Sequence, residues 1–352
     1  MDDNLHRMGA DGALRDRRQR PWRDLRISLT DRCNFRCGYC MPRSKFGPGH
    51  RFLPQSRLLN FEEIAQVARQ ALALGVRTLR LTGGEPLLRR DLHRLVGQLA
   101  ALRTLDGTAP DLALTTNGSL LAAQAQSLRD AGLNRLTVSL DALDDAVFQC
   151  MNEVGFPVDE VLRGLEAAQR AGFERIKVNM VVRRGVNDGE ALPLAEHFRH
   201  SGMVLRFIEF MDAGRHNGWK LGEVLPSAEL RARVAARWPL LPLPAARAGE
   251  TAERWGYADG AGEIGFISSV SQAFCGDCTR ARLTAEGQLY TCLFSSQGHD
   301  LRPLLRGPHG SEAGLRERLA AIWAGRSDAY SEQRERLSVI RVVRPDMHVL
   351  GG

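Results

Sequence analysis

Short strand-like segments alternate with amphipathic helical segments from residue 25 to about residue 211. Strand patterns occupy residues 25–30, 76–83, 111–118, 133–141, 174–182 and 204–211. Amphipathic periodicity predicts helices over residues 61–74, 92–102, 120–131, 158–171 and 191–199. Strands that alternate with helices of this length predict parallel βαβ units. We therefore expect an α/β fold, an incomplete (β/α)6 barrel of the TIM type.

Several of these strands carry a polar residue at every second position. The polar positions are Arg26, Ser28 and Thr30; Arg80 and Thr82; Thr137, Ser139 and Asp141; and Lys177 and Asn179. A parallel sheet that is covered by helices on both faces should instead be apolar throughout. Because the helices need the apolar face, the polar face must line the barrel, where unpaired charges are costly to bury. The pattern therefore predicts a wet, cationic ligand cavity with its reactive end at the C-terminal rim of the strands.

The alternating pattern ends after Met211. Gly214, Gly218, Pro226 and the string PLLPLP at residues 239–244 interrupt the helical periodicity. Residues 245–262 have the composition of a loop, and a further helix is expected near residues 315–324. These changes predict three regions, a flexible N-terminal arm (1–21), the partial barrel (22–212) and a smaller C-terminal domain (213–352).

Composition and charge narrow the classes of partner. Basic residues outnumber acidic ones by 48 to 41, and lysine occurs only at Lys45, Lys177 and Lys220. The arginine bias can reflect genomic base composition, whereas a spread excess of positive charge favours anionic ligands. No dense basic run follows residue 24 and no apolar stretch is long enough to span a membrane, so we expect no nucleic-acid partner and no membrane. Seven cysteines without a secretory signal predict a reducing compartment, the cytoplasm.

Three cysteines stand close together in the string CNFRCGYC, directly after the first strand pattern. They are Cys33, Cys37 and Cys40. Three thiolates ligate only three irons of a four-iron cluster, and a metal site with an open position is typically catalytic. A structural zinc site would normally show a fourth ligand nearby, and the nearest histidine, His50, lies beyond a turn rich in Gly and Pro. The string therefore predicts an open iron–sulfur cluster. Cys150, in a helical stretch, is expected to be a small buried residue.

A second set of three cysteines lies in the C-terminal region. Its members are Cys275, Cys278 and Cys292. We expect a second iron–sulfur cluster here, and a zinc ribbon completed by His299 is the structural alternative. Arg280 and Arg282 are two residues apart, so on an extended segment both side chains point the same way. Paired guanidinium groups suit phosphates or carboxylates, although alone they are also typical of a solvated strand.

The string CNFRCGYC resembles the signature of the radical S-adenosylmethionine (SAM) enzymes. Over residues 22–352 the chain also resembles the GTP 3′,8-cyclases of molybdenum cofactor biosynthesis. The motifs that carry this resemblance are CNFRCGYC, RLTGGEPLLRRDL, TTNG, RIKVN, RFIEFM, AGEIGFI, FCGDCTRARL, LYTCLF and the terminal Gly351–Gly352. Both cysteine sets together with the string RAR and the Gly-Gly end are more specific than any single motif.

The resemblance implies two [4Fe-4S] clusters, held by the two cysteine sets, and SAM bound to the open iron of the first. It implies SAM contacts at Tyr39, Gly84, Ser139 and Met211, and GTP contacts at Arg26, Arg80, Thr115, Lys177, Arg280 and Arg282. Arg206 is a further substrate contact on the same grounds. The resemblance also implies catalytic roles for Arg280, Arg282, Gly351 and Gly352, with the C-terminal tail entering the site. Tyr39, Ser139 and Met211 have ordinary packing roles as alternatives, and a frayed terminus is the alternative for the tail.

The implied activity is the conversion of GTP to 3′,8-cyclo-7,8-dihydro-GTP by a 5′-deoxyadenosyl radical. The implied partners are cyclic pyranopterin monophosphate synthase (MoaC), which acts on the product, and an electron donor such as flavodoxin or ferredoxin; the protein itself would be a homodimer or a monomer. Two other functions remain open from the residues. One is a radical SAM enzyme that modifies peptides or proteins and carries an auxiliary cluster; the other is a zinc-stabilised basic binding module.

Overall fold

Six parallel strands form a curved sheet with helices on its outer side in the computed structural model, which describes residues 8–308, 310–334 and 344–351. The strands are β1 (Asp24–Ser28), β2 (Thr78–Thr82), β3 (Asp111–Thr116), β4 (Arg135–Ser139), β5 (Ile176–Val182) and β6 (Val204–Glu209). The helices are α1 (Phe61–Ala73), α2 (Leu92–Ala100), α3 (Leu121–Asp130), α4 (Asp145–Asn152), α5 (Val158–Arg170) and α6 (Ala191–Phe198). The predicted incomplete barrel is confirmed.

Local sequence explains several of the element boundaries. Helix α1 begins after Asn60 because the Asn60 side chain accepts the backbone N–H of Glu63, while the Glu63 carboxylate accepts that of Asn60. Helix α4 begins after Asp144, whose side chain caps the backbone N–H of Val147. Cys150 lies in α4, but it is exposed, so the expectation that it is buried is wrong.

The C-terminal strands extend the same sheet at both of its edges. They are β7 (Leu240–Leu243), β8 (Glu253–Tyr257), β9 (Glu263–Ile267), β10 (Arg280–Leu283), β11 (Gln288–Tyr290) and β12 (His299–Asp300). The strand order is β12-β11-β10-β1-β2-β3-β4-β5-β6-β9-β8-β7, with β10 parallel to β1 and β9 parallel to β6. The loop expected over residues 245–262 is therefore wrong in part, because β8 pairs with both β7 and β9 there.

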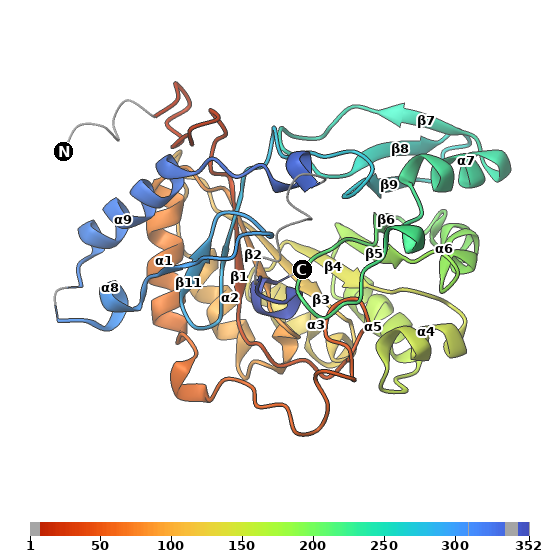
Figure 1. Ribbon diagram of the computed structural model, residues 1–352, viewed down its shortest axis with the longest axis horizontal. Coiled ribbons are helices and arrows are strands. Elements are labelled where there is room, and N and C mark those ends of the chain that lie inside the picture. Colours follow the sequence, from red (N-terminus) through yellow and green to blue (C-terminus); the bar gives the residue numbers. More distant parts are fainter. Residues whose placement is uncertain (1–7, 309, 335–343, 352) are drawn as a thin grey trace.

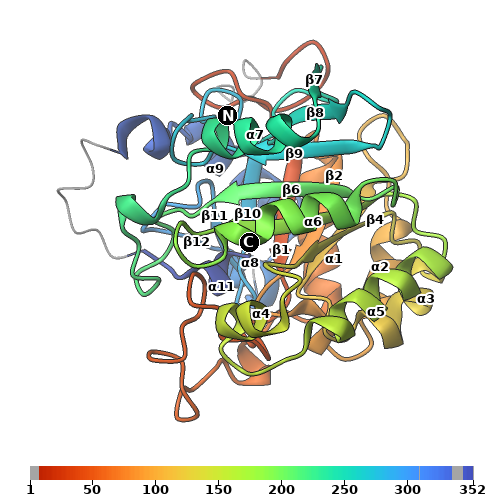
Figure 2. The same ribbon diagram turned by 90° about the vertical axis from the view of Figure 1, so that its right-hand side faces the viewer.

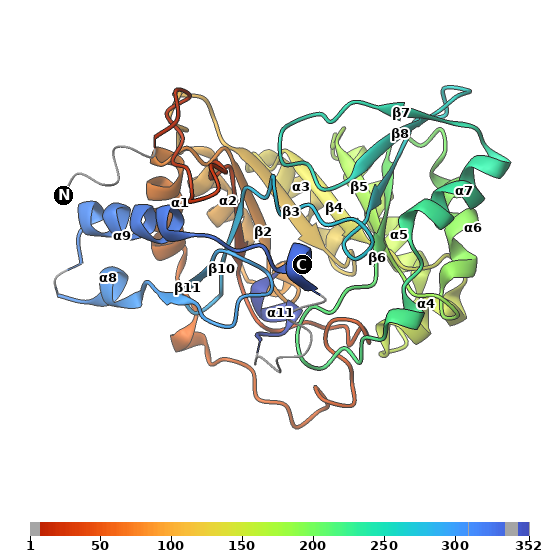
Figure 3. The ribbon, with the colours of Figure 1, turned by 45° about the horizontal axis from the view of Figure 1, so that its top comes forward.

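Three further helices pack outside this sheet, α7 (Ser227–Arg237), α8 (Arg302–Arg306) and α9 (Glu312–Gly325). A short helix, α11 (Met347–Leu350), lies near the end of the described chain. Helix α9 packs on α1 and confirms the helix expected near residues 315–324. Figure 2 shows α6 beside β6 and α7 beside β9. Figure 3 shows α11 and the C-terminal end on the concave side of the sheet, opposite the barrel helices.

Alternate residues of each barrel strand supply the apolar core between sheet and helices. Leu79 and Leu81 of β2, Val138 of β4 and Val178 of β5 are fully buried in it. Their neighbours along each strand point into the barrel, as the polar alternation predicted. Within the described part of the chain, no helix combines the length and apolar composition needed to cross a bilayer.

Residues 8–21 pack against the body of the protein, which differs from the flexible arm expected for residues 1–21. Leu14 is 1% exposed and the Asp16 side chain is fully buried. Trp22, which follows, stacks on Trp323 of α9 with 5.4 Å between the ring centroids. The part of the arm that the structure describes is therefore anchored to α9.

Candidate active site

One cavity of about 440 Å³ runs through the barrel and collects nearly all of the predicted site residues. Its lining includes Cys33, Cys37, Tyr39, Cys40, Gly84, Ser139, Met211, Arg26, Arg80, Thr115, Lys177, Arg206, Arg280, Arg282, Cys275, Cys278 and Cys292. Gly351 lies against the end of β2, as described below. The predicted catalytic residue Gly352 lies outside the described residues.

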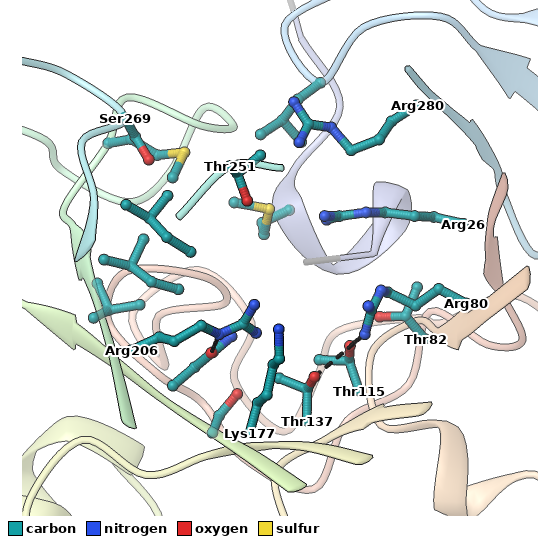
Figure 4. A pocket seen from close by; sticks show the side chains of 18 of the residues that line it. Arg26, Arg80, Thr82, Thr115, Thr137, Lys177, Arg206, Thr251, Ser269 and Arg280 are labelled. Carbon is teal, nitrogen blue, oxygen red and sulfur yellow. Dashed lines mark hydrogen bonds between the residues drawn. The ribbon is translucent and has the colours of Figure 1, made fainter. Parts of the chain in front are cut away.

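Sheet register explains why basic side chains that are far apart in sequence meet in this cavity. Arg26 of β1 is paired with Arg80 of β2 on one side and with Arg282 of β10 on the other. On the far side of the barrel, Asn179 of β5 is paired with Arg206 of β6, and the Asn179 carboxamide oxygen accepts a hydrogen bond from Arg206 Nε at 2.9 Å. Residues in register share a face, and all of these residues line the cavity. Figure 4 shows the side chains of Arg26, Arg80 and Arg206 directed toward its centre.

Hydrogen bonds among the wall residues orient part of this cationic belt. Arg80 Nη1 donates to Thr115 Oγ1 at 3.1 Å and to Thr137 Oγ1 at 3.3 Å (Figure 4). Threonine hydroxyls provide no charge. These two hydrogen bonds therefore orient the Arg80 guanidinium without neutralising it.

Burial and mutual repulsion lower the pKa values of the cations in this belt. Burial, with Arg282 nearby, lowers the pKa of Arg26 to about 9, and burial, with Arg80 nearby, lowers that of Arg206 to about 9. Burial and Arg206 lower the pKa of Lys177 to about 8. The Nε atoms of Arg26 and Arg282 are buried without a hydrogen-bond partner. An anionic ligand with several oxygens would relieve both the repulsion and the missing hydrogen bonds.

The first cysteine set lies at the C-terminal end of the barrel, where Cys33 follows β1. Cys33 Sγ accepts the backbone N–H of Phe35 at 3.4 Å and Asn117 Nδ2 at 3.8 Å. Burial raises the pKa of Cys33 to about 12, and burial also raises the pKa values of Cys37 and Cys40. Three sheltered sulfur atoms with N–H donors directed at one of them fit an iron–sulfur cluster, whose irons would displace the thiol protons.

Groups that suit a bound cofactor surround this first set. The Tyr39 hydroxyl donates to Asp141 Oδ2 at 2.9 Å, and Asp141 Oδ1 accepts the backbone N–H of Val181 at 2.9 Å. This clamp fixes the Tyr39 ring beside its neighbouring cysteines. A Cβ atom on Gly84 would lie 2.1 Å from the Arg32 carbonyl oxygen, so only glycine fits the turn after β2.

The second cysteine set lies at the opposite, N-terminal end of the barrel strands. Cys278 precedes β10, and Arg280 at the start of β10 is in register with Asp24, the first residue of β1. A five-residue strand spans about 16 Å, which is therefore the approximate separation of the two ends. A ligand that reaches from one cysteine set to the other would pass along the cationic belt.

Charge prepares the second set for metal binding. Burial opposes ionisation of Cys278, but Arg280 and Arg326 outweigh it, and the pKa of Cys278 falls to about 6. Arg280 Nη2 lies 3.3 Å from Cys278 Sγ, and Cys292 Sγ accepts the backbone N–H of Phe294 at 3.5 Å. A thiolate with N–H donors fits an iron–sulfur cluster here as well.

Neither set has the geometry of a single-ion site. Across the described residues, no three Cys, His, Asp or Glu side chains converge closely enough to hold one metal ion. His299, the zinc ligand considered for the second set, lies on β12 and is not among the residues that line the cavity. The structure therefore gives no support to the zinc alternative.

The C-terminal segment is held inside the barrel mouth. Asp346 Oδ1 accepts the backbone N–H of Arg215 at 2.8 Å, and Asp346 Oδ2 lies 2.8 Å from His216 Nδ1. Beyond α11, Gly351 adopts a φ of +72°, and a Cβ atom there would lie 2.2 Å from Thr82 Cγ2. The tail thus approaches the end of β2 closely, at a point where only glycine fits.

Sequence reasoning missed the loop that joins β7 to β8. Arg247, Glu250 and Thr251 of this loop line the cavity, although the segment was expected only to be a loop. No motif or periodicity marks it, because its position depends on the pairing of β7 and β8 at the sheet edge. Asn117, by contrast, stands in the TTNG string and could have been proposed as a site residue.

Known proteins match the chain over nearly its whole length. The family described as Radical SAM superfamily matches residues 27–198, and the family described as Molybdenum Cofactor Synthesis C matches residues 203–332. The GTP 3′,8-cyclase of Acidothermus cellulolyticus is 55% identical over 91% of this chain and 88% of its own length. That of Xanthomonas campestris pv. campestris strain B100 is 53% identical over 96% and 97%, and that of Staphylococcus haemolyticus 42% identical over 96% and 99%. The solved structure of His6-tagged anSMEcpe with bound AdoMet is 17% identical, with a TM-score of 0.47 over 62% of this chain and 58% of that one.

Proposed function

Because the chain belongs to the GTP 3′,8-cyclase family of radical SAM enzymes, we propose that its barrel cavity is the site where GTP becomes 3′,8-cyclo-7,8-dihydro-GTP. This lyase reaction is the first step of molybdenum cofactor biosynthesis, to which the C-terminal family match also belongs. The observation that carries the assignment to this cavity is the cationic belt that links two three-cysteine sets. Because the relatives are GTP 3′,8-cyclases, nothing supports the alternative of a radical SAM enzyme that modifies peptides or proteins.

The first cysteine set would hold the [4Fe-4S] cluster that radical SAM enzymes use. Cys33, Cys37 and Cys40 are its ligands in this proposal, and the contacts with SAM come from Tyr39, Gly84, Ser139 and Met211. When bound, this pair supplies a 5′-deoxyadenosyl radical that takes the hydrogen atom from ribose C3′ of GTP. The Tyr39–Asp141 clamp would hold the aromatic ring in place against the adenine.

The second cysteine set would hold a second [4Fe-4S] cluster close to the guanine base. Its ligands would be Cys275, Cys278 and Cys292. Arg280, which contacts Cys278 Sγ, is placed to hydrogen bond both to a ligand of this cluster and to a base beside it. Arg282, two residues further along β10, points the same way. We therefore assign both arginines to orienting the guanine so that C8 faces C3′.

The remaining cationic residues would bind the triphosphate. They are Arg26, Arg80, Lys177 and Arg206, which line the cavity, and Thr115 fixes Arg80. Several guanidinium groups and an ammonium group match the three linked phosphates in charge and in hydrogen-bond donors. Enclosure of the substrate would also exclude water from the reacting carbon.

The position in biosynthesis suggests further partners for this chain. The product would pass to cyclic pyranopterin monophosphate synthase (MoaC), and an electron donor such as flavodoxin or ferredoxin would supply electrons. We place the enzyme in the cytoplasm, as a homodimer or a monomer, with the C-terminal Gly351–Gly352 segment completing the site.

Anaerobic reconstitution followed by turnover tests this proposal. Iron and sulfide should correspond to two four-iron clusters, and incubation with SAM, dithionite and GTP should give 5′-deoxyadenosine and the cyclised nucleotide together. Cleavage of SAM that does not depend on GTP, or iron sufficient for one cluster only, would contradict it.

A double variant separates the roles of the arginines from cluster binding. Arg280→Ala with Arg282→Ala should retain both clusters and lose the cyclised product, by at least about 100-fold in rate, because two substrate donors are gone. Arg302→Ala, which removes a cation paired with Asp300 away from the cavity, is the control and should retain activity. If the double variant loses iron, the arginines are structural instead.

A further inference from the structure

The β7–β8 loop, residues 244–252, spans the N-terminal mouth of the barrel and is tied to three parts of it. Arg247 Nη1 donates to Thr78 Oγ1 at 3.1 Å, and Arg247 Nη2 lies 3.5 Å from Asp24 Oδ2, which connects the loop to β2 and β1. Gly249 packs beside the second cysteine set, since a Cβ atom there would lie 2.6 Å from the Asp277 carbonyl oxygen. Glu250 reaches β5 on the far side. The loop therefore bridges the mouth where the belt ends.

Glu250 directs a carboxylate into the cationic cavity from this loop. Its side chain is 12% exposed, and Glu250 Oε1 lies 4.0 Å from Lys177 Nζ. The other oxygen, Oε2, accepts the backbone N–H of Ala246 at 2.8 Å, within the loop itself. At 4.0 Å the contact with Lys177 is an ion pair but not a hydrogen bond. The Glu250 oxygen that faces the cavity is therefore held by an ion pair with Lys177 and not by a hydrogen bond.

The other two carboxylates at this end of the cavity are occupied in a different way. Asp111 accepts hydrogen bonds from both Nε and Nη2 of Arg135. Asp24 is an ion-pair partner of Arg247 and also compensates Arg80 and Arg26, on the β1–β2 side of the cavity. Glu250 differs in position, because it compensates Lys177 and Arg206 on the β5–β6 side. A polyphosphate that binds these cations must compete with the Glu250 carboxylate for them.

We propose that Glu250 is an internal counter-ion of the substrate site, which compensates Lys177 and Arg206 while the cavity holds no nucleotide and is displaced by the phosphate chain. This inference rests on the proposed function for the identity of the anion. Glu250 then sets how tightly the phosphate chain is held: it offsets repulsion between buried cations before binding and repels phosphate oxygens afterwards. Glu250 is a specificity-determining residue that limits affinity for anions and leaves the uncharged part of the ligand unaffected.

Binding measurements on the reconstituted enzyme test the inference. Glu250→Gln should tighten the binding of GTP and of inorganic triphosphate by roughly tenfold at low salt, without added magnesium, because one like charge is removed. Guanosine, which has no phosphate, should bind equally to both proteins. Glu250→Asp keeps the charge and should stay closer to the native protein than Glu250→Gln does.

A matched control comes from the next acidic residue along the chain. Glu253 pairs with Arg231 and does not line the cavity, so Glu253→Gln should leave all three affinities unchanged. Weaker binding of triphosphate to Glu250→Gln would overturn the inference, because the carboxylate would then contribute to the complex. An unchanged affinity would overturn it as well. Because triphosphate binding requires no turnover, these outcomes are separate from the failure of the cyclase assay, which would overturn the proposed function instead.

Discussion

Lys177 is the lysine among the described residues that line the cavity, in a chain that has only two other lysines. Its surroundings are mixed in sign: Arg206 and Arg135 lower its pKa together with burial, whereas Glu250 and Glu263 raise it, and the result is about 8. An arginine at this place would keep its charge to a higher pH, because its pKa starts from a higher value. Lysine therefore makes substrate binding dependent on pH.

The sign of this dependence follows from linkage. The pKa of Lys177 in the free protein is depressed to about 8, and a bound triphosphate would raise it, so the complex holds more protons than the free protein above that pH. Affinity for GTP should therefore be constant below about pH 7 and fall by up to about tenfold per pH unit above pH 8. Binding titrations between pH 6.5 and 9.5 measure this.

Lys177→Arg is the control, because the pKa of an arginine starts from a higher value and its charge persists to a higher pH. Any loss of affinity that it shares with the native protein belongs to the nucleotide or to Arg26 and Arg206, whose pKa values are about 9. An equal slope in both proteins would show that Lys177 does not contact the phosphates.

At this scale the sequence could predict the inward-facing residues but not all of their neighbours. The period-two alternation was enough to place Arg26, Arg80 and Lys177 on the lumen side, because strand geometry alone determines which face a residue occupies. Glu250 could not be predicted, because it is brought to Lys177 by a loop whose position depends on long-range strand pairing.

The C-terminal tail is an element whose position depends on contacts far along the chain. Asp346 joins it to the loop after β6 through Arg215 and His216, about 130 residues earlier in sequence. No local pattern encodes such a contact, and only the family resemblance pointed to the tail as part of the site. The strands and helices of the barrel, in contrast, were predicted because their periodicity is local.

Gly351→Ala should displace this tail. The new methyl group would overlap Thr82 Cγ2, and the positive φ of Gly351 would also strain an alanine by about 1 kcal/mol. We expect turnover of GTP to fall at least about tenfold, while iron content and SAM affinity stay unchanged, since the cysteines and Gly84 are untouched. Product formation and SAM titration measure the two effects.

Gly325→Ala is the matched control, because nothing lies within 4 Å of a Cβ atom at the end of α9. Full activity of Gly351→Ala would show that the tail takes no part in the reaction.

At the scale of the whole molecule, the sheet and the N-terminal segment connect the three regions that the sequence predicted as separate, residues 1–21, 22–212 and 213–352. Strands from residues beyond 212 continue the barrel sheet at both edges, so the two cysteine sets are fixed relative to each other through β1 and β10. The boundaries predicted at residues 21 and 212 remain predictions about folding units. Local patterns indicated where the barrel strands lie. They could not predict that β10 pairs with β1 and β9 with β6, because these pairings join strands far apart in the sequence.

A buried ion cluster connects the N-terminal segment to the second cysteine set. Asp16 Oδ2 accepts Arg20 Nε at 2.6 Å and lies 3.5 Å from Arg326 Nη1, and all three side chains are at least 95% buried. Both arginines continue outward to the cysteine loop: Arg20 Nη1 donates to the carbonyl oxygen of Cys275 at 2.8 Å and Arg326 Nη1 to that of Cys278 at 2.7 Å. The loop that would bind the second cluster is therefore held by an aspartate far away in the sequence.

Asp16→Ala should consequently lower stability and release the second cluster first. Asp16 is the carboxylate that both buried guanidinium groups share, and Arg326 also pairs with Asp328 Oδ2 at 3.4 Å. Removing Asp16 should cost about 3–5 kcal/mol in the free energy of unfolding. The cysteine loop should loosen with it, so iron should fall toward the amount for one cluster while SAM binding at the first set persists. Asp11→Ala is the control, because its ion pairs with Arg15 and Arg23 are partly exposed and should contribute less than about 1 kcal/mol. Thermal unfolding with iron analysis measures both effects, and a variant that keeps all its iron would show that the loop is positioned without Asp16.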